Sequence, residues 1–197
     1  MNIKVLIDNN TLIDRYFLGE PGVSYLIEEG EKQILFDLGY SNAFILNAAK
    51  MNVDLLKSDF IVLSHGHLDH TWGLDPLIKL YTEARIESLS FLNPTLVAHP
   101  QAFSTKSGDG LTEIGSLVSL EKLDKHFKLK LTKESFWLTD KLVFLGEIER
   151  TNDFENKTPI GKAYYDNKIT DDFLLDDTAL AYKSNQGLVI ITGCSHS

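Results

Sequence analysis

The sequence contains a single cysteine, Cys194, among 197 residues, so no disulfide can form within the chain. Its apolar runs fall well short of the roughly 20 residues that a membrane-spanning helix requires. The N-terminal segment MNIKVLIDNN lacks the basic start, the long apolar core and the small-residue cleavage site of a secretory signal peptide. A lone cysteine fits a reducing compartment, and we therefore expect a cytoplasmic protein that does not contact a membrane.

Long basic runs are also missing from the chain. It has 28 acidic and 19 basic residues, which gives a formal net charge of −9. Nucleic-acid binding usually depends on clustered lysine and arginine, so this balance argues against nucleic acid as a partner. Bound divalent cations would reverse the local field of an acidic site, which leaves metal-dependent chemistry on a small-molecule substrate open.

No internal repeat and no low-complexity linker divides the chain, and we expect one domain over residues 1–197. The pattern of apolar residues indicates the elements and loops in chain order. It predicts strands over 3–8, 59–65, 95–100 and within 127–149, hairpins over 22–39 and 178–193, helices over 41–52 and 73–85, and loops over 101–115 and 149–167. This succession predicts a layered α/β protein.

Histidine is scarce and concentrated at one place. Of six histidines, His65, His67 and His70 lie within six positions, where the apolar run IVLS ends. Side chains two apart on an extended strand point the same way, so His65 and His67 can bind one metal ion. Asp69 and His70 follow at the turn and can reach a second ion, and these ligand types suit zinc. The alternative is a polar loop that binds nothing, but polar groups at the end of a buried strand need the compensation that coordination supplies.

The segment His65-Gly66-His67-Leu68-Asp69-His70 resembles the H-x-H-x-D-H signature of the metallo-β-lactamase superfamily. The segments DDTALAY and GLVIITGCSH, together with VLIDNN and NAAKMNVDLLKSDFIVLSHGH, are similar to a subgroup that includes an archaeal dihydropterin ribofuranosylaminobenzene phosphate synthase. The resemblance covers most of the chain and is weakest between residues 101 and 170. It implies a four-layered αββα sandwich with metal ions at one end of the sheets.

Candidate ligands outside the histidine signature lie near the C-terminus. His196 follows an apolar strand in the same setting as His65, and we expect a metal ligand there, the alternative being a solvent-exposed side chain. Cys194 is either a ligand or, as we favour, a small packed residue. The resemblance marks Asp176 and Asp177 as functional, as a metal ligand or as an acceptor for a histidine N–H, with Asp176 preferred; the alternative is a solvated pair.

Two further residues at strand ends are interpreted differently. By resemblance, Asp37 in ILFDLG is a buried residue that steadies the metal loop, and the alternative is a turn residue before Gly39. His99 in VAHP also follows a strand, and we expect a structural or substrate-facing role for it instead of coordination.

The resemblance implies a metal-dependent hydrolase that uses a metal-bound hydroxide as the nucleophile. Two divalent ions are expected, zinc first, with manganese or iron as alternatives. In that mechanism Asp69 is the catalytic residue, because it can orient the nucleophile or relay its proton. The sequence does not specify the substrate, although the subgroup suggests a phosphate-bearing or pterin-like small molecule.

Two other functions remain open. A diiron oxidoreductase or a transferase could use the same scaffold, but the diiron members usually carry a glutamate where His67 stands, which favours hydrolysis. The chain also ends at GCSHS inside a motif, whereas members of the family usually continue, so we expect a C-terminally short form with an incomplete second half. Such a form could be an inactive metal-binding relative, or a second copy or partner chain could complete its sheet.

Overall fold

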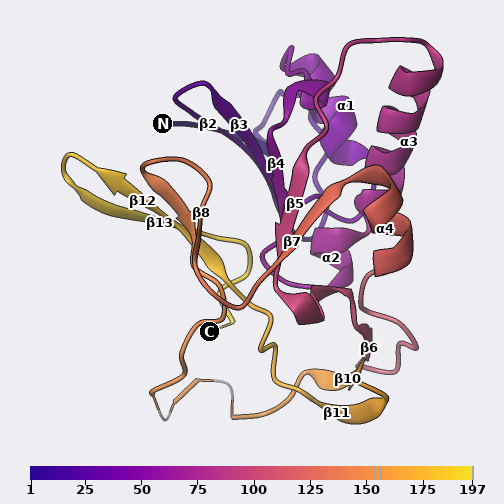
Figure 1. Ribbon diagram of the computed structural model, residues 1–197, viewed down its shortest axis with the longest axis vertical. Coiled ribbons are helices and arrows are strands. Elements are labelled where there is room, and N and C mark those ends of the chain that lie inside the picture. The colour runs from indigo at the N-terminus through magenta and orange to yellow at the C-terminus, as the bar shows by residue number, and fades with distance from the viewer. Residues whose placement is uncertain (153, 156, 197) are drawn as a thin grey trace.

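The larger of two facing sheets runs through the middle of the molecule (Figure 1). The computed structural model describes residues 1–152, 154–155 and 157–196. The strands of this sheet are β1 (Asn2–Ile7), β2 (Ser24–Glu29), β3 (Lys32–Phe36), β4 (Phe60–Val62), β5 (Thr95–Ala98) and β7 (Lys128–Leu131). Their order is β1-β2-β3-β4-β5-β7, antiparallel from β1 to β3 and parallel from β3 onward.

Two smaller sheets complete the β structure. The four-stranded sheet contains β8 (Phe136–Trp137), β9 (Leu142–Phe144), β12 (Ala179–Ser184) and β13 (Gly187–Thr192), in the order β13-β12-β9-β8. The three-stranded sheet contains β6 (Thr105–Ser107), β10 (Gly161–Tyr165) and β11 (Lys168–Asp172), in the order β11-β10-β6. In Figure 1 the four-stranded sheet lies to the left of the large sheet, and the three-stranded sheet lies below it.

The helices cover one face of the large sheet, on the side away from the four-stranded sheet (Figure 1). They are α1 (Ala43–Lys50), α2 (Leu68–Thr71), α3 (Leu74–Ile86) and α4 (Leu120–His126), with the short 3₁₀ helices η1 (Leu55–Lys57) and η2 (Pro100–Phe103). Within the described residues, the core between the two sheets contains no helix residue. The structure therefore has the expected α/β class and two facing sheets, with helices on the outer side of one of them.

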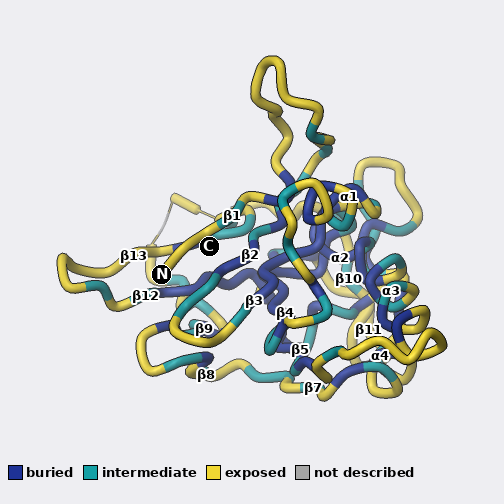
Figure 2. The backbone as a smooth tube through the Cα atoms, turned by 90° about the horizontal axis from the view of Figure 1, so that it is seen from above, coloured by how far each residue is buried: buried dark blue, intermediate teal, exposed yellow. Residues whose placement is uncertain are grey.

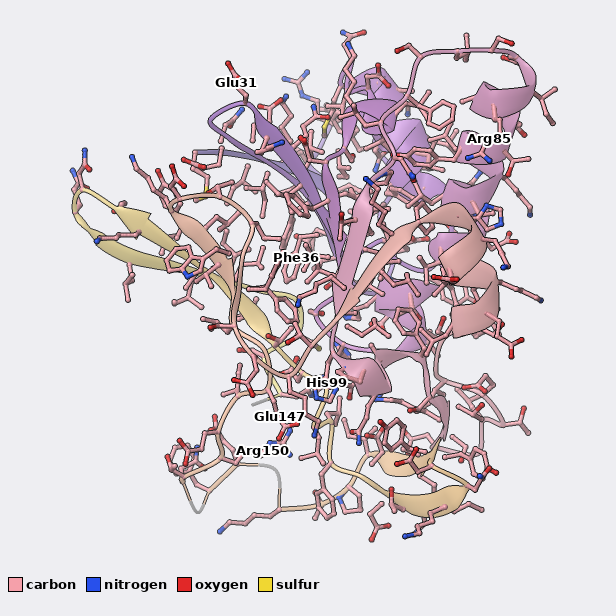
Figure 3. All side chains as sticks on the ribbon, viewed as in Figure 1. Glu31, Phe36, Arg85, His99, Glu147 and Arg150 are labelled. Carbon is pink, nitrogen blue, oxygen red and sulfur yellow. The ribbon has the colours of Figure 1, made fainter. Side chains whose placement is uncertain are left out.

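Alternating side chains of the central strands supply two separate cores. On β3, Ile34 and Phe36 pack between the two sheets, whereas Leu35 packs against the helices. Phe36 lies in the space between the sheets in Figure 3, and Figure 2 shows the central strands buried along most of their length. Strands buried on both faces read as continuous apolar runs, which is why ILF and FIV carried a clear signal in the sequence.

Most of the predicted elements are confirmed, and the exceptions lie in polar segments. The strand predicted over 59–65 ends at Val62, so the histidines occupy a loop and α2 instead of the strand itself. The loop predicted over 101–115 contains β6 and most of η2, and the loop predicted over 149–167 contains the whole of β10. Positions 153 and 156 of that second loop lie outside the described residues. These short polar strands are defined by their backbone pairing, and their sequences lack the alternation of apolar residues that would predict a strand.

The parallel strands end at one edge of the large sheet, and the polar residues of interest follow them there. Asp37 comes directly after β3, the histidine loop follows β4, and His99 follows β5. The C-terminal end of β13 brings His196 to the same edge. None of the helices in the described part of the chain combines the length and apolarity needed to cross a bilayer.

Candidate metal centre

A loop with little freedom carries the histidines from β4 into α2. Gly66 lies so close to η2 that a Cβ atom there would stand 2.2 Å from the carbonyl oxygen of Ala102. The backbone N–H of Leu68 donates to the carbonyl of Ile114 at 2.8 Å, which fixes the start of α2. Only glycine permits this close approach to Ala102, so the backbone between His65 and His67 is held by its packing against η2.

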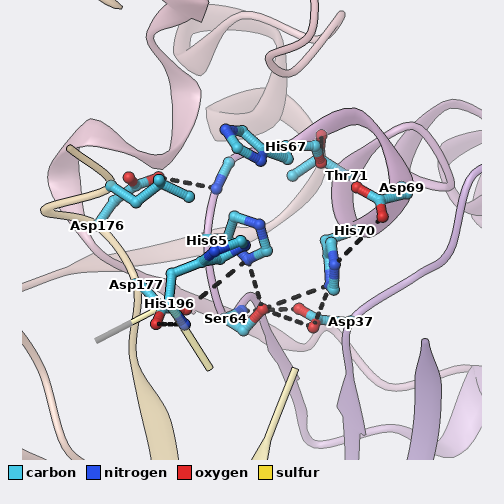
Figure 4. Close-up of polar contacts among 12 residues, drawn as sticks. Asp37, Ser64, His65, His67, Asp69, His70, Thr71, Asp176, Asp177 and His196 are labelled. Atoms are coloured by element: carbon cyan, nitrogen blue, oxygen red, sulfur yellow. Dashed lines mark hydrogen bonds and ion pairs between the residues drawn. The ribbon is translucent and has the colours of Figure 1, made fainter. Parts of the chain in front are cut away.

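The three histidines of this loop converge below the surface (Figure 4). The ring centroids of His65 and His70 are 4.2 Å apart, and those of His65 and His67 are 4.8 Å apart. His65 and His70 are each 1% exposed, and His67 is 9% exposed. The sequence-based expectation that these side chains meet is therefore confirmed by their positions.

Hydrogen bonds on one side of the rings determine which nitrogen atoms remain for a ligand. His70 Nδ1 lies 2.7 Å from Asp37 Oδ2, and the Ser64 hydroxyl donates to the same oxygen at 2.6 Å. Since the hydroxyl hydrogen of Ser64 is used there, its oxygen accepts from His65 Nδ1 at 3.0 Å. Among the described residues, the buried Nε2 atoms of His65 and His70 have no hydrogen-bond partner. Buried polar atoms are normally satisfied, so two orphaned imidazole nitrogens in one cluster fit a metal ion.

The electrostatic environment differs between the two buried rings. Burial lowers the pKa of His65 well below its ordinary value, and the neighbouring imidazoles and Lys106 act in the same direction. His65 is thus neutral, the form that coordinates metal. Burial also acts to lower the pKa of His70, but Asp37 overrides it and raises that pKa to about 10. An ion that binds His70 must therefore displace a proton, which makes its affinity depend on pH.

The C-terminal segment brings two more candidate ligands to the cluster. The ring centroid of His196 lies 5.1 Å from that of His65 and 5.9 Å from that of His67. In the part of the chain that the structure describes, two groups have ligand atoms within 4.8 Å of one another: His65, His67 and His196 form one, and His65, His70 and Cys194 form the other. Cys194 is exposed, so the expectation of a packed residue is wrong. His196 and His70 lower the pKa of its thiol to about 7, which favours the thiolate that binds metal.

Asp69 lies at the rim of the cluster. Its side chain is 28% exposed, and its Oδ2 is 3.6 Å from His70 Nε2. A cavity of about 230 Å³ opens beside it, lined in part by His67, Asp69 and Leu111. A partly solvated carboxylate between the histidines and a cavity is placed to contact both a metal ion and a bound small molecule.

Gly22 fixes the backbone of Asp69, and this contact can be tested. A Cβ atom at Gly22 would stand 1.9 Å from the carbonyl oxygen of Asp69, and Gly22 has a φ of +85°. We expect G22A to lower the free energy of unfolding by about 1–3 kcal/mol more than G30A does. Gly30 is a matched control because it also has positive φ, +60°, but open space around it. Urea denaturation of both variants measures the difference, and equal losses would contradict the steric argument.

Asp176 and Asp177 hold different parts of the site (Figure 4). Both Asp176 oxygens accept from the ammonium group of Lys106, at 2.8 and 3.0 Å, and Oδ2 also accepts from the Gly66 N–H at 2.8 Å. Asp177 Oδ2 accepts from the His196 N–H at 2.7 Å, and its Oδ1 lies 4.0 Å from His65 Nδ1. Asp176 as a metal ligand stays a prediction; its contacts here are those of an acceptor that holds the histidine loop.

Two other expectations concern residues beside the cluster. Asp37 is fully buried and accepts from the Ser64 N–H at 2.7 Å, as expected for a residue that steadies the loop. His99 accepts from the Gln101 N–H at 3.1 Å through Nδ1, and its Nε2 lies 3.0 Å from Glu147 (Figure 3). Both ring nitrogens of His99 are thus engaged by protein groups, in agreement with a structural role.

Sequence reasoning missed Lys106 and Asp172, which lie next to the cluster. Lys106 is 1% exposed, and Asp172 Oδ2 is 3.4 Å from both Lys106 Nζ and His67 Nε2. The lysine stands in the polar segment STKSGDG, where nothing distinguishes it from a solvated side chain. Asp172 follows another aspartate in a strand that lacks an apolar pattern.

Comparison with known proteins places this geometry in a family. Residues 18–130, which include β2 to β5 and the histidine loop, match the family described as the metallo-beta-lactamase superfamily. The chain belongs to the metallo-β-lactamase superfamily. The histidine cluster at the strand ends is accordingly the part of this superfamily member in which metal-dependent chemistry is to be sought.

Relatives of this superfamily member resemble nearly its whole length. It is 31% identical over 196 residues to an uncharacterized protein of Methanocaldococcus jannaschii, covering 99% of this chain and 70% of that protein. It is also 31% identical over 210 residues to the 7,8-dihydropterin-6-methyl-4-(beta-D-ribofuranosyl)-aminobenzene-5'-phosphate synthase of the same organism, covering 99% of this chain and 68% of that one. The solved structure of a metal-dependent hydrolase of the beta-lactamase superfamily aligns with a TM-score of 0.74 at 26% identity, covering 98% of this chain and 66% of the other.

Proposed function

We propose that the chain is a metal-dependent hydrolase that holds two divalent ions, zinc first, and acts on a small molecule. The observation that carries the proposal is the pair of buried Nε2 atoms of His65 and His70, which have no hydrogen-bond partner among the described residues and belong to rings whose centroids lie 4.2 Å apart. Further support comes from the relative that is named as a metal-dependent hydrolase.

The ligand groups divide naturally between two ions. His65, His67 and His196 would hold one, and His65, His70 and Cys194 mark the neighbourhood of the other, with Asp69 at its rim. When bound, such ions lower the pKa of a coordinated water toward neutrality and polarise the oxygen atom of a substrate. Zinc fits a set of imidazoles with one thiol, and manganese or iron are the alternatives.

The protein side chains contribute orientation and proton movement. Ser64 fixes the His65 ring and Asp37 fixes the His70 ring, each through the Nδ1 atom of the histidine. The Nε2 atoms of both rings are therefore left for an ion. Asp69 is the catalytic residue that we assign, since its carboxylate lies between the cluster and the cavity. There it can accept a hydrogen bond from the attacking water and orient it toward a substrate.

Metal binding can be tested without knowing the substrate. We expect zinc at about 100 times its dissociation constant to stabilise the fold by about 2.7 kcal/mol. For a chain of this length the melting temperature should rise by roughly 5–10 °C, measured by calorimetry with the chelated protein as reference. Metal analysis should give two ions per chain, and a panel of phosphodiesters, thioesters and lactones should reveal hydrolysis. A chain that neither binds zinc nor changes its melting temperature would contradict the proposal.

A second candidate function rests on the similarity to a relative that is named as a synthase. The same cluster could support a transfer reaction on a phosphate-bearing or pterin-like substrate. If zinc binds at two ions per chain but no panel substrate is hydrolysed, this candidate is favoured. Iron with a visible absorption band would instead indicate redox chemistry.

A further inference from the structure

Lys106 is a charged side chain that is almost completely buried, an arrangement that costs free energy. It lies on β6 and is 1% exposed, and its ammonium group is enclosed by Asp176 and Asp172. A buried ammonium group loses its hydration, and partner carboxylates often do no more than offset that loss. A buried ion pair is therefore weak evidence for a contribution to the stability of the fold. The residues that the pair holds in place are a better guide to its role.

Both carboxylates that contact Lys106 also contact the histidine loop. Asp176 accepts from the Gly66 N–H at 2.8 Å, between the two histidines of the motif. Asp172 Oδ2 lies 3.4 Å from His67 Nε2. One cation on β6 thus reaches both the backbone of the loop and the ring of His67, each through a single carboxylate.

The contact with Asp172 determines which nitrogen of His67 is available. A carboxylate only accepts, so the His67 nitrogen that faces it, Nε2, carries the hydrogen. Nδ1 is then the atom with a lone pair. A ring turned or protonated the other way would place an N–H where an ion has to bind.

From these contacts we infer that Lys106 is a positioning residue of the metal centre: it holds Asp172 and Asp176 so that His67 keeps Nδ1 available for an ion. This inference rests on the proposed function, because it assigns Lys106 a part in the same centre. It parallels the arrangement on the other side of the cluster, where Asp37 fixes His70. This role would also explain why the polar segment that contains Lys106, distant in sequence, packs near the histidine loop.

The first experiment uses the metal-free chain, so it does not depend on catalysis or on metal affinity. Nitrogen NMR of the imidazoles reports which nitrogen carries the hydrogen. We expect His67 in the Nε2–H form in the unmodified chain and a mixture of both forms in K106M. The control is K162M, which breaks the surface pair of Lys162 with Asp171 on the neighbouring strand. A His67 tautomer that is the same in K106M as in the unmodified chain would overturn the inference.

The second experiment measures zinc affinity by competition with a chelator. Loss of an outer partner of a metal-binding histidine typically lowers affinity 10–100-fold, and we expect this loss in K106M but not in K162M. K106R should recover much of the affinity, because a second cation can still contact both carboxylates. Unchanged or tighter binding in K106M overturns the inference, whereas an unmodified chain that fails to bind zinc overturns the proposed function.

A double variant guards against misfolding of K106M, which leaves two buried carboxylates without their cation. In K106M/D176N one negative charge is removed, and the amide oxygen still accepts from the Gly66 N–H. We expect this variant to fold by circular dichroism and still show the His67 mixture and the weaker zinc binding. A folded double variant with the tautomer and the affinity of the unmodified chain would again overturn the inference.

Discussion

Replacing His65 with alanine is expected to remove both metal ions and all detectable hydrolysis. His65 is the residue common to both ligand groups, with its ring 4.8 Å from that of His67 and 4.2 Å from that of His70. Loss of an outer partner alone costs about 10–100-fold in affinity, so loss of a shared ligand should exceed this for each ion. Metal analysis after dialysis, together with the rate on any active panel substrate, measures the effect.

The control for H65A has to remove an imidazole that lies outside the cluster. His126 ends α4, and H126A should retain both ions and the full rate. Circular dichroism and thermal melting in the presence of chelator separate metal loss from unfolding. If H65A retained two ions and full activity, the assignment of the cluster as the metal centre would be wrong.

Replacing Asp37 with asparagine should have the next largest effect, because it changes hydrogen bonding with little change in shape. The carboxylate accepts from the Ser64 N–H and hydroxyl and holds His70 Nδ1 at 2.7 Å. An asparagine can keep its oxygen on the Ser64 N–H, but its NH₂ group would then stand in place of Oδ2 and force His70 to accept at Nδ1, which moves the hydrogen of His70 to Nε2. That hydrogen would point into the cluster, so zinc affinity should fall by about 10–100-fold.

The stability of D37N should also fall, since buried donors lose an acceptor. We expect about 1–3 kcal/mol in the free energy of unfolding, measured by urea denaturation of the metal-free chain. D59N is the matched control: Asp59 accepts from the Gln33 N–H and pairs with Lys32, at the opposite end of β4. D59N should bind zinc normally, and equal zinc affinity in D37N would refute the role of Asp37.

Local patterns in the sequence are sufficient to predict most of the fold and about half of the residues of the candidate site. The apolar runs of β3, β4 and β5 and the spacing of His65, His67 and His70 act over a few residues, so a single reading of the chain detects them. The third sheet was missed because its pairing joins polar strands far apart in sequence, with Lys162 of β10 opposite Ser107 of β6. Register of that kind depends on tertiary context that no periodicity contains.

The missed residues of the site share one physical reason. Lys106 and Asp172 gain their importance from each other and from His67, across separations that only folding brings together. The exposure of Cys194 could not be predicted from the sequence either, because a lone cysteine after an apolar strand is as compatible with a packed side chain as with an exposed metal ligand. The preference for Asp176 over Asp177 had no sequence basis beyond resemblance, and the two side chains turn out to face different neighbours.

Under the proposed function, the spacing of the histidine loop has a consequence for how the protein would acquire its ions. His65, His67, Asp69 and His70 are neighbours along the chain, so a newly made or unfolded polypeptide already offers them as a short chelating peptide. The proposed ligands from a distant segment, Cys194 and His196, reach the cluster only when β13 packs against the rest of the fold. Under the proposed function, the histidine loop could thus bind an ion before the C-terminal strands are in place.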